Sequence, residues 1–267
     1  MLPFPNIGPD IVRIGPLRVR WYGLMYLAGF VASYFLIRRQ KRAKQLGLQG
    51  SLLQDLFLFL VIGMILGARL GYILFYQFPN YGIYIKNPLE IIALWHGGMS
   101  FHGGLVGTML AGLLFCRKKG LPFWDVGDIV IVTAPIGLFL GRLGNFINGE
   151  LFGRPSSVPW AMLFPNGGPV ARHPSQLYEA ALEGVLLFLV LWRLKDLPFR
   201  PGSMICFFIG GYGFVRFFVE FFREPDPQIG FIFGFMTMGQ VLCSAMVVAA
   251  IVLWRLLPKS PEYSKNN

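Results

Sequence analysis

The amino-acid sequence predicts an all-α integral membrane protein with about seven transmembrane helices. Of its 267 residues, 55% are hydrophobic and only 14% are charged, whereas a soluble domain carries about 25% charged residues. Apolar segments of about 20 residues, the length that a bilayer requires, recur along the whole chain. No linker or low-complexity tract divides the sequence, so residues 1–267 are expected to form a single transmembrane bundle domain.

Seven segments have the length and apolar character of a membrane span. In chain order they are Trp21–Ile37, Leu53–Tyr76, Leu94–Cys116, Val126–Phe146, Gln176–Leu194, Ser203–Phe222 and Thr237–Leu257. Basic residues cluster in the loops at 38–44, 117–119 and 193–200, all on one predicted side. Because such residues favour the cytoplasm, the N-terminus is expected outside and the C-terminus inside. The N-terminal segment is an exception, with Arg13, Arg18 and Arg20.

Two segments on the predicted outer side are rich in turn and aromatic residues. The first, at about residues 78–94, is expected to be an interfacial arm, because aromatic residues favour the membrane–water interface. Its turn and aromatic residues are Pro79, Tyr81, Tyr84 and Pro88, with Trp95 just beyond. The second, at about residues 147–175, contains five prolines and is expected to form a small head outside the membrane.

Charge and cysteine content exclude two classes of protein. The net charge is +11, but the basic residues lie between apolar runs rather than in a patch with aromatic residues, so nucleic-acid binding is not expected. The three cysteines, Cys116, Cys206 and Cys243, lie in or beside apolar runs without paired spacing. They are therefore expected to be packing residues rather than a disulfide framework or a metal site.

The segment Gly141–Gly153 is the most informative motif. It reads Gly-Arg-Leu-Gly-Asn-Phe-Ile-Asn-Gly-Glu-Leu-Phe-Gly and follows the apolar run Ile129–Leu140. Its polar residues are Arg142, Asn145, Asn148 and Glu150. An arginine near the bilayer centre costs about 2.5–3.5 kcal/mol on insertion scales, and its planar fork suits a phosphate. The motif therefore predicts a functional site at the end of a membrane helix.

A second motif, His96–Gly107, combines two histidines with two Gly-Gly pairs. The glycines are expected to break or thin a span, which is tolerated where the backbone lines a cavity or packs in protein. His102 would there handle a proton or stabilise an anion near neutral pH. The alternative is a helix-packing face of small residues with a core histidine.

Two further motifs place charged residues four positions apart. Glu179, at the end of the motif His173–Glu179, shares a helix face with Glu183, and two carboxylates on one membrane face need cationic or hydrogen-bonding partners. The alternative is that these glutamates face the surface, which suits Glu183 better than Glu179. Arg216 and Glu220 form a second pair, within an aromatic span.

Together these motifs offer cations to an anionic group. The cations are Arg142 and Arg216, with Arg69 or Arg154 as further candidates, and Glu150, Glu179 and Glu220 are expected to orient them. No P-loop, zincin, Ser-His-Asp or Cys-x-x-Cys motif is present in the sequence. The expected reaction therefore needs neither a bound nucleotide nor a metal, and its energy lies in the substrates.

These motifs, in this order, resemble those of the prolipoprotein diacylglyceryl transferases. The resemblance rests on residues 141–153, the His-Gly-Gly-Met-Ser-Phe-His-Gly-Gly segment, the His-Pro-Ser-Gln-Leu-Tyr-Glu segment, Arg216-x-x-x-Glu220 and the region of Tyr22 and Tyr26. It covers nearly the whole chain, from about Gly15 to Leu257.

The resemblance implies an enzyme of the bacterial inner membrane that acts on its periplasmic side and uses no cofactor. The family transfers an sn-1,2-diacylglyceryl group from phosphatidylglycerol to the lipobox cysteine thiol of a prolipoprotein. The products are a thioether and glycerol 1-phosphate. This is the first step of lipoprotein maturation.

The resemblance also implies a set of site residues. The expected catalytic residues are Tyr26, His102, Arg142, Glu150 and Arg216. Those expected to bind substrate are Arg142, Asn145, Asn148, Gly153, Glu179, Arg216 and Glu220. We expect His102 to act as the base or to stabilise the thiolate, and both arginines to hold the phosphate. Two alternatives stay open: a transporter or channel for an anionic solute or lipid, and another phospholipid transferase or a phospholipase.

Overall fold

The computed structural model describes residues 2–5, 7–8, 10–14, 17–78, 81–93, 96–224, 231–232 and 235–257. Pro79, Leu94 and Trp95 of the predicted arm and span lie outside these residues. The chain forms two compact units, Met1–Gln40 with Asp128–Asn267, and Lys41–Gly127. It passes from the second unit back into the first within helix α6 (Phe123–Ile131).

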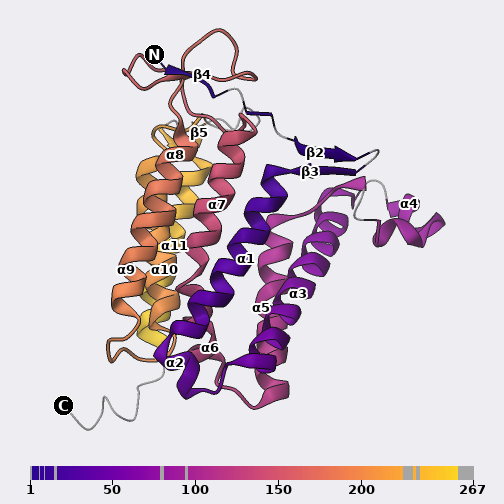
Figure 1. Cartoon of the computed structure of the whole chain (residues 1–267), viewed down its shortest axis with the longest axis vertical. Helices are drawn as coiled ribbons and strands as arrows, with labels where there is room; N and C mark the ends of the chain where they lie inside the picture. Colours follow the sequence, from indigo (N-terminus) through magenta and orange to yellow (C-terminus); the bar gives the residue numbers. More distant parts are fainter. Residues whose placement is uncertain are drawn as a thin grey trace. The chain divides into compact units, whose positions relative to one another are not determined.

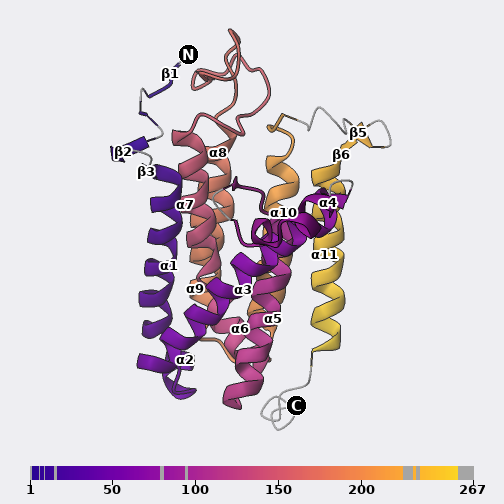
Figure 2. The same cartoon turned by 90° about the vertical axis from the view of Figure 1, so that its right-hand side faces the viewer.

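The first unit is a bundle of helices (Figures 1 and 2). Its helices are α1 (Trp21–Arg39), α7 (Ala134–Ile147), α8 (Ser175–Glu179), a π-helical segment (Ala180–Leu186), α9 (Leu187–Leu194), α10 (Ser203–Val219) and α11 (Met238–Leu256). The sequence explains where several of them begin. Pro135 occupies the first turn of α7, where its missing N–H costs nothing. Thr237 and Gln240 form a capping box at the start of α11.

Buried contacts join these helices. Asp128 is 1% exposed, and its carboxylate accepts hydrogen bonds from the backbone N–H groups of Gly202 (2.8 Å) and Ile205 (3.1 Å) at the start of α10. Gly184 of the π-helical segment lies against α7, since a Cβ there would be 2.6 Å from the Phe139 Cβ. These contacts hold α10, which carries the predicted Arg216, and the π-helical segment, which carries Glu183, in place.

Short strands flank the helices of the first unit. Among the described residues they form three two-stranded sheets: β1 (Leu2–Pro3) with β4 (Met162–Leu163), β2 (Asp10–Ile14) with β3 (Leu17–Arg20), and β5 (Phe231–Ile232) with β6 (Met236–Thr237). The segment between α7 and α8 carries β4 and lies beyond the ends of both helices in both views (Figures 1 and 2). It coincides with the predicted head.

The second unit is built on a pair of tightly packed helices. Its helices are α2 (Lys41–Gln45), α3 (Gly50–Tyr76), α4 (Tyr81–Lys86), a 3-10 helix (Pro88–Ile91) and α5 (Phe101–Lys119). Glycines at four-residue spacing let the backbones of α3 and α5 approach closely. A Cβ on Gly67 would be 2.3 Å from the Gly103 carbonyl oxygen, and one on Gly107 would be 2.1 Å from that of Gly63. This is the close approach that small residues allow between membrane helices.

Replacing Gly67 by Ala is expected to destabilise the second unit by about 1–3 kcal/mol, the usual cost of overpacking. The added methyl group would meet backbone atoms of α5, which cannot move out of its way as a side chain end can. Thermal unfolding in detergent measures the loss. Gly82→Ala in α4 is the matched control, because nothing lies within 4 Å of its Cβ position. Equal stability of the two variants would contradict the packing of α3 on α5.

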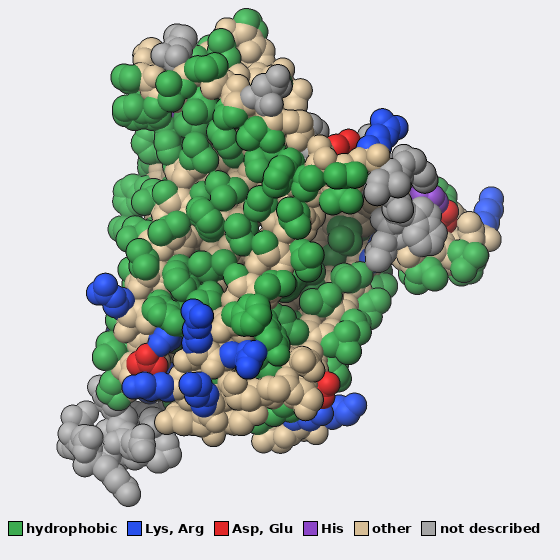
Figure 3. All heavy atoms as spheres, in the orientation of Figure 1, with side chains coloured by type: hydrophobic (Ala, Val, Ile, Leu, Met, Phe, Trp, Pro, Cys, Tyr) green, Lys and Arg blue, Asp and Glu red, His purple; other side chains and the backbone are tan. Residues whose placement is uncertain are grey.

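The predicted membrane character is confirmed in its coarse form. Among the described residues, three helical stretches are long and apolar enough to cross a membrane: Gly50–Tyr76, Phe123–Ile147 and Met238–Leu256. On the face of the first unit drawn in Figure 3, hydrophobic side chains cover the middle of the helices. Lys and Arg side chains gather near the end where α1 and α9 finish. A helix lies at each of the seven predicted spans, while the count of seven and the orientation stay predictions.

Candidate active site

The motif at residues 141–153 folds as the last turns of α7 followed by a tight turn. Arg142 and Asn145 lie three residues apart and therefore on one face of the helix. Arg142 Nη1 donates to Asn145 Oδ1 at 3.4 Å. The amides of Asn145 and Asn148 donate to Glu150 Oε1 at 2.9 and 3.1 Å. The four predicted polar residues thus form one hydrogen-bonded chain, and Glu150 reaches Arg142 through Asn145.

The turn after α7 is held by the start of α8. Leu151 has φ of 57°, a conformation that is uncommon for a residue with a side chain. Ser175 Oγ donates to the Leu151 carbonyl at 3.1 Å, and Gln176 Nε2 donates to the Glu150 carbonyl at 2.6 Å. Both side chains are fully buried. The polar residues of the motif His173–Glu179 therefore position the turn that carries Glu150, a role that the sequence did not indicate.

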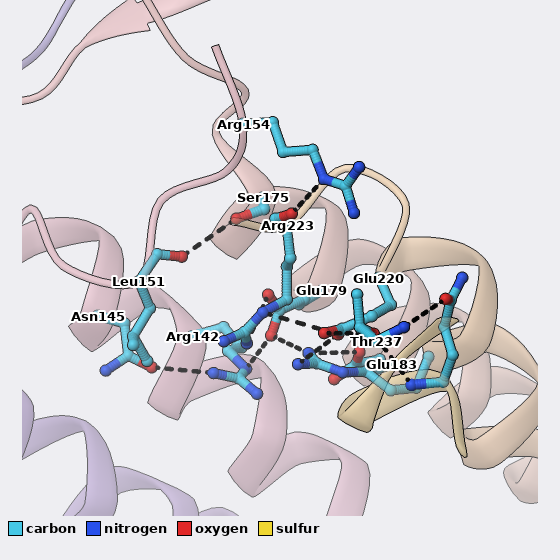
Figure 4. Close-up of polar contacts among 12 residues, drawn as sticks. Arg142, Asn145, Leu151, Arg154, Ser175, Glu179, Glu183, Glu220, Arg223 and Thr237 are labelled. Atoms are coloured by element: carbon cyan, nitrogen blue, oxygen red, sulfur yellow. Dashed lines mark hydrogen bonds and ion pairs between the residues drawn. The ribbon is translucent and has the colours of Figure 1, made fainter. Parts of the chain in front are cut away.

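Glu179 is the centre of a buried ionic cluster in the first unit. Its side chain is 0% exposed, and its Oε2 lies 2.6 Å from Arg142 Nε and 2.6 Å from Arg216 Nη1. Its Oε1 lies 3.4 Å from Arg223 Nη1. Figure 4 shows Arg142, Glu179 and Arg223 pointing toward one another. A carboxylate withdrawn from water is stable only with such partners, so the cluster accounts for the burial of Glu179.

Arg216 connects Glu179 to two further carboxylates. Its Nη1 lies 3.2 Å from Glu183 Oε1, and its Nη2 lies 3.1 Å from Glu220 Oε2. The predicted pair of Arg216 and Glu220 is therefore confirmed. The surface-facing alternative for Glu183 is wrong, because its side chain is 0% exposed. The four-residue spacing puts Glu183 on the face of Glu179, and α10 brings Arg216 to that face.

Arg223 also belongs to the cluster, although it lies outside the predicted motifs. In addition to its contact with Glu179, Arg223 approaches Glu220: the Arg223 Nε lies 3.7 Å from Glu220 Oε2. Burial and the nearby Arg216 guanidinium lower the pKa of Arg223, yet an arginine stays charged at any ordinary pH. The spacing of Arg216, Glu220 and Arg223 at i, i+4 and i+7 follows one helix face. That spacing was the available signal.

The cluster is closed on one side by the predicted head. Gly153 pairs with Arg223 through the backbone, and a Cβ on Gly153 would be 2.3 Å from the Phe222 carbonyl oxygen. Only glycine allows this approach without displacing the backbone. Arg154 Nε donates to the Arg223 carbonyl at 2.7 Å, as Figure 4 shows. The structure thus gives Gly153 a packing role, and its contact with substrate stays a prediction.

Arg142 and Arg216 differ in what they have left to offer a ligand. The contacts of Arg216 within the described residues use both Nη atoms, on three carboxylates, and leave only Nε with its single N–H. The contacts of Arg142 within the described part of the chain use Nε and Nη1, which leaves Nη2 for a ligand. The Arg142 side chain also keeps 17% exposure, against 12% for Arg216. Arg142 is therefore the better candidate for contact with an anion.

The predicted Tyr26 joins this site through its neighbour on α1. The hydroxyl groups of Tyr22 and Tyr26 are 3.0 Å apart. Tyr22 packs on α7, where a Cβ on Gly144 would be 3.0 Å from the Tyr22 ring. Tyr26 is 45% exposed. A tyrosine pair thus lies beside the turn of α7 that carries Asn145.

An apolar groove of about 310 Å³ lies between the head and α10 in the first unit. Its lining includes Trp160, His173, Tyr178 and Phe222. The Trp160 indole N–H donates to the Tyr178 hydroxyl at 2.6 Å, and that hydroxyl lies 3.0 Å from His173 Nδ1. Burial lowers the pKa of His173, so the neutral ring is favoured near pH 7. The polar groups of this wall satisfy one another and leave an apolar surface.

His102 lies in the second unit, in the first turn of α5. Gly97 and Gly98 before it have φ of 76° and 77°, so the predicted break in the span is real. Helix α5 accordingly begins at Phe101 rather than at Leu94. Gly103 and Gly107 are helical and pack on α3, so the small-residue alternative is right for them. Joint action of His102 with the Arg142 cluster stays a prediction.

The pair of Arg216 and Glu220 is expected to show coupled energetics. Breaking a buried pair costs about 3–5 kcal/mol, and Glu220→Ala also removes the acceptor of the Thr237 hydroxyl at 3.3 Å. The double variant Arg216→Ala/Glu220→Ala is expected to lose less stability than the sum of the single losses. Turnover should not return, because Arg216, which pairs with Glu179 and Glu183 as well as Glu220, is missing. Thermal unfolding and turnover measure the cycle, and strictly additive losses would show that the two residues do not interact.

Comparison with known proteins identifies the family of the chain. The family model for prolipoprotein diacylglyceryl transferase matches residues 9–256. A phosphatidylglycerol–prolipoprotein diacylglyceryl transferase of Rhodospirillum rubrum is 52% identical over 258 residues, covering 95% of this chain and 93% of the relative. Proteins of the same name from Bordetella avium (52%, covering 96% and 97%) and Desulfotalea psychrophila (48%, covering 94% and 93%) are similarly close. The chain therefore belongs to the prolipoprotein diacylglyceryl transferase family.

Proposed function

We propose that this membrane enzyme transfers the sn-1,2-diacylglyceryl group of phosphatidylglycerol to the lipobox cysteine thiol of prolipoproteins. Its relatives are named for both substrates, phosphatidylglycerol and prolipoprotein. The observation that carries the proposal is Arg142, which lies near the end of an apolar helix and whose Nη2 has no partner among the described residues. An anionic lipid brings its phosphate to this position while its acyl chains remain in the apolar environment.

The reaction balances without a cofactor. The cysteine sulfur forms a bond to the terminal carbon of the diacylglyceryl group, and the bond between that carbon and the phosphate oxygen breaks. The electron pair leaves with the phosphate, so glycerol 1-phosphate is released and a thioether remains. The thiol has a pKa near 8.5 in water and reacts as the thiolate. We assign His102 as the group that takes the thiol proton or stabilises the thiolate.

The ionic cluster supplies the electrostatic part of this mechanism. Arg142 holds the donor phosphate and stabilises the charge that grows on it as the bond breaks. Asn145, Asn148 and Glu150 fix one side of its guanidinium, and Glu179 fixes the other. Arg216 also acts on the phosphate, and Glu179 and Glu220 orient its guanidinium. The same contacts keep these buried carboxylates paired. Tyr26 and Gly153 complete the set of proposed site residues. Tyr26 lies beside α7, and Gly153 lies where the backbone of the head closely approaches Phe222.

The proposed setting is the bacterial inner membrane. Seven spans with the N-terminus outside and the C-terminus inside would put the end of α7, the head and the arm on the periplasmic side. The basic loops favour this orientation. Prolipoproteins would then present the lipobox cysteine at the outer surface of the membrane. The proposed arm includes α4 and the 3-10 helix, neither of which has a buried residue.

Purified protein in liposomes that contain phosphatidylglycerol tests the function. Glycerol 1-phosphate should appear only when a lipobox peptide is added, and the same peptide with Ser in place of Cys should give none. Release without the cysteine peptide would indicate a phospholipase or another head-group transferase. Movement of labelled lipid or solute across the membrane without any product would indicate a transporter.

A further inference from the structure

Arg69 is a buried arginine in the second unit that has a different kind of partner from the arginines of the cluster. It lies on α3 and is 5% exposed. Its guanidinium donates to the backbone carbonyl oxygens of Glu90 (2.6 Å), Ile91 (3.0 Å), Gly98 (3.1 Å) and Gly97. These bonds occupy Nε and both Nη atoms. An arginine bound in this way holds backbone rather than a phosphate.

The backbone that Arg69 holds is the segment that leads into α5. Gly98 lies on the Tyr72 ring of α3, since a Cβ there would be 2.3 Å from a ring carbon. The Arg69 guanidinium lies 5.8 Å from the centre of the same ring. The segment before α5 is therefore fixed to α3 by a guanidinium and a ring.

The same connection continues to His102. The Ser100 backbone N–H donates to the Ala68 carbonyl, next to Arg69, at 2.8 Å. The Ser100 hydroxyl accepts from the Gly103 N–H at 3.2 Å and so caps α5. His102 is the second residue of that helix. Its place at the helix start thus depends on where residues 97–100 lie.

We propose that Arg69 is a positioning residue for His102, fixing the segment from which α5 begins. This inference rests on the proposed function and on the role assigned to His102. Lys at position 69 would keep the charge but present its three N–H donors from one atom, so it cannot reach carbonyls spread from residue 90 to residue 98. Position 69 therefore requires the planar guanidinium of arginine and not only a positive charge.

Arg69→Lys tests the proposal, with Arg117→Lys as the matched control on the exposed end of α5. In Arg69→Lys, amide hydrogen exchange at Ser100 and Gly103 is expected to rise at least tenfold. The kcat is expected to fall at least tenfold, while the KM for phosphatidylglycerol stays within twofold. The control should change none of these. Unchanged exchange, or a loss seen only in KM, would overturn the proposal and point to a role in lipid binding.

A double-mutant cycle separates positioning from general damage. In the His102→Gln background, Arg69→Lys is expected to lower kcat by less than twofold, because the residue that it positions is already gone. Equal fold losses in both backgrounds would show that Arg69 does not act through His102. Near-normal turnover of the single variant His102→Gln would likewise show that Arg69 does not act through His102. If His102→Gln has no measurable turnover, exchange and the comparison of kcat with KM decide.

If Arg69→Lys does not fold, Gly98→Ala displaces the same segment from the side of Tyr72 and should give the same exchange and kcat changes. Normal exchange and kcat in Gly98→Ala would count against the proposal. Failure of the proposed function is distinguishable from failure of this inference. Wild-type protein that gives no peptide-dependent glycerol 1-phosphate contradicts the function, whereas the exchange experiment still reports whether Arg69 holds the segment.

Discussion

Glu179→Gln is expected to destroy activity and to lower the free energy of unfolding by about 3–5 kcal/mol, the cost of leaving buried charges unpaired. Glu179 is 0% exposed and contacts the guanidinium groups of Arg142, Arg216 and Arg223. The neutral amide keeps the shape of the side chain but removes the charge that holds three like charges together. Thermal unfolding in detergent and release of glycerol 1-phosphate measure the two losses.

Glu224→Gln is the matched control for this prediction. Glu224 also pairs with an arginine, Arg172 at 2.7 Å, but its side chain is 42% exposed. An exposed ion pair contributes about 0–1 kcal/mol, so this variant should keep its stability and turnover. A stable and active Glu179→Gln variant would show that the arginines do not depend on the buried carboxylate.

Arg142→Lys is expected to lose about 10²–10³-fold in turnover, the usual effect of removing one donor that stabilises a developing charge. The protein should still insert and fold, because the positive charge beside Glu179 remains. Lys cannot contact Glu179, Asn145 and a phosphate at once through a planar fork. Turnover is measured in liposomes at saturating phosphatidylglycerol and lipobox peptide, together with thermal stability.

Arg39→Lys is the control for the same substitution in the same unit. Arg39 is exposed at the end of α1, where only its charge should matter. Near-normal turnover in Arg142→Lys would remove Arg142 as the phosphate ligand. A loss of activity in both variants would point to a general effect of the arginine-to-lysine change.

The sequence predicted the helices well where apolar runs were unbroken. Helix α11, Met238–Leu256, lies within the predicted span Thr237–Leu257. The predictions were less accurate where the local backbone conformation interrupts a helix within an apolar run. The predicted span Val126–Phe146 consists of α6 and α7, separated at Val132 and Thr133. Pro135 was the signal for this break, because a proline cannot donate a hydrogen bond to the carbonyl four residues before it, here Ile131, and its ring clashes with that carbonyl.

The candidate site was predictable where its contacts are local. Arg216 with Glu220 and Asn145 with Glu150 lie within five residues of each other, so helix and turn geometry bring them together. The contacts of Arg216 with Glu183 and of Arg223 with Glu179 were not predictable in this way. They depend on α10 packing against the π-helical segment and α8, and a single sequence does not say which helix faces which. For the same reason the sequence offered Arg69 as a cation for an anionic group, whereas its partners are backbone carbonyls.

The central claim is that the buried cluster holds the phosphate of the donor lipid through Arg142. Measuring the binding of that lipid tests the claim most directly. Native mass spectrometry of wild type, Arg142→Lys and Arg39→Lys, each titrated with phosphatidylglycerol without any peptide, measures this step apart from chemistry. Wild type and Arg39→Lys should bind with the same Kd, and Arg142→Lys should bind at least tenfold more weakly. A diacylglycerol without phosphate should not distinguish the three proteins. Equal phosphatidylglycerol affinity in all three would contradict the claim.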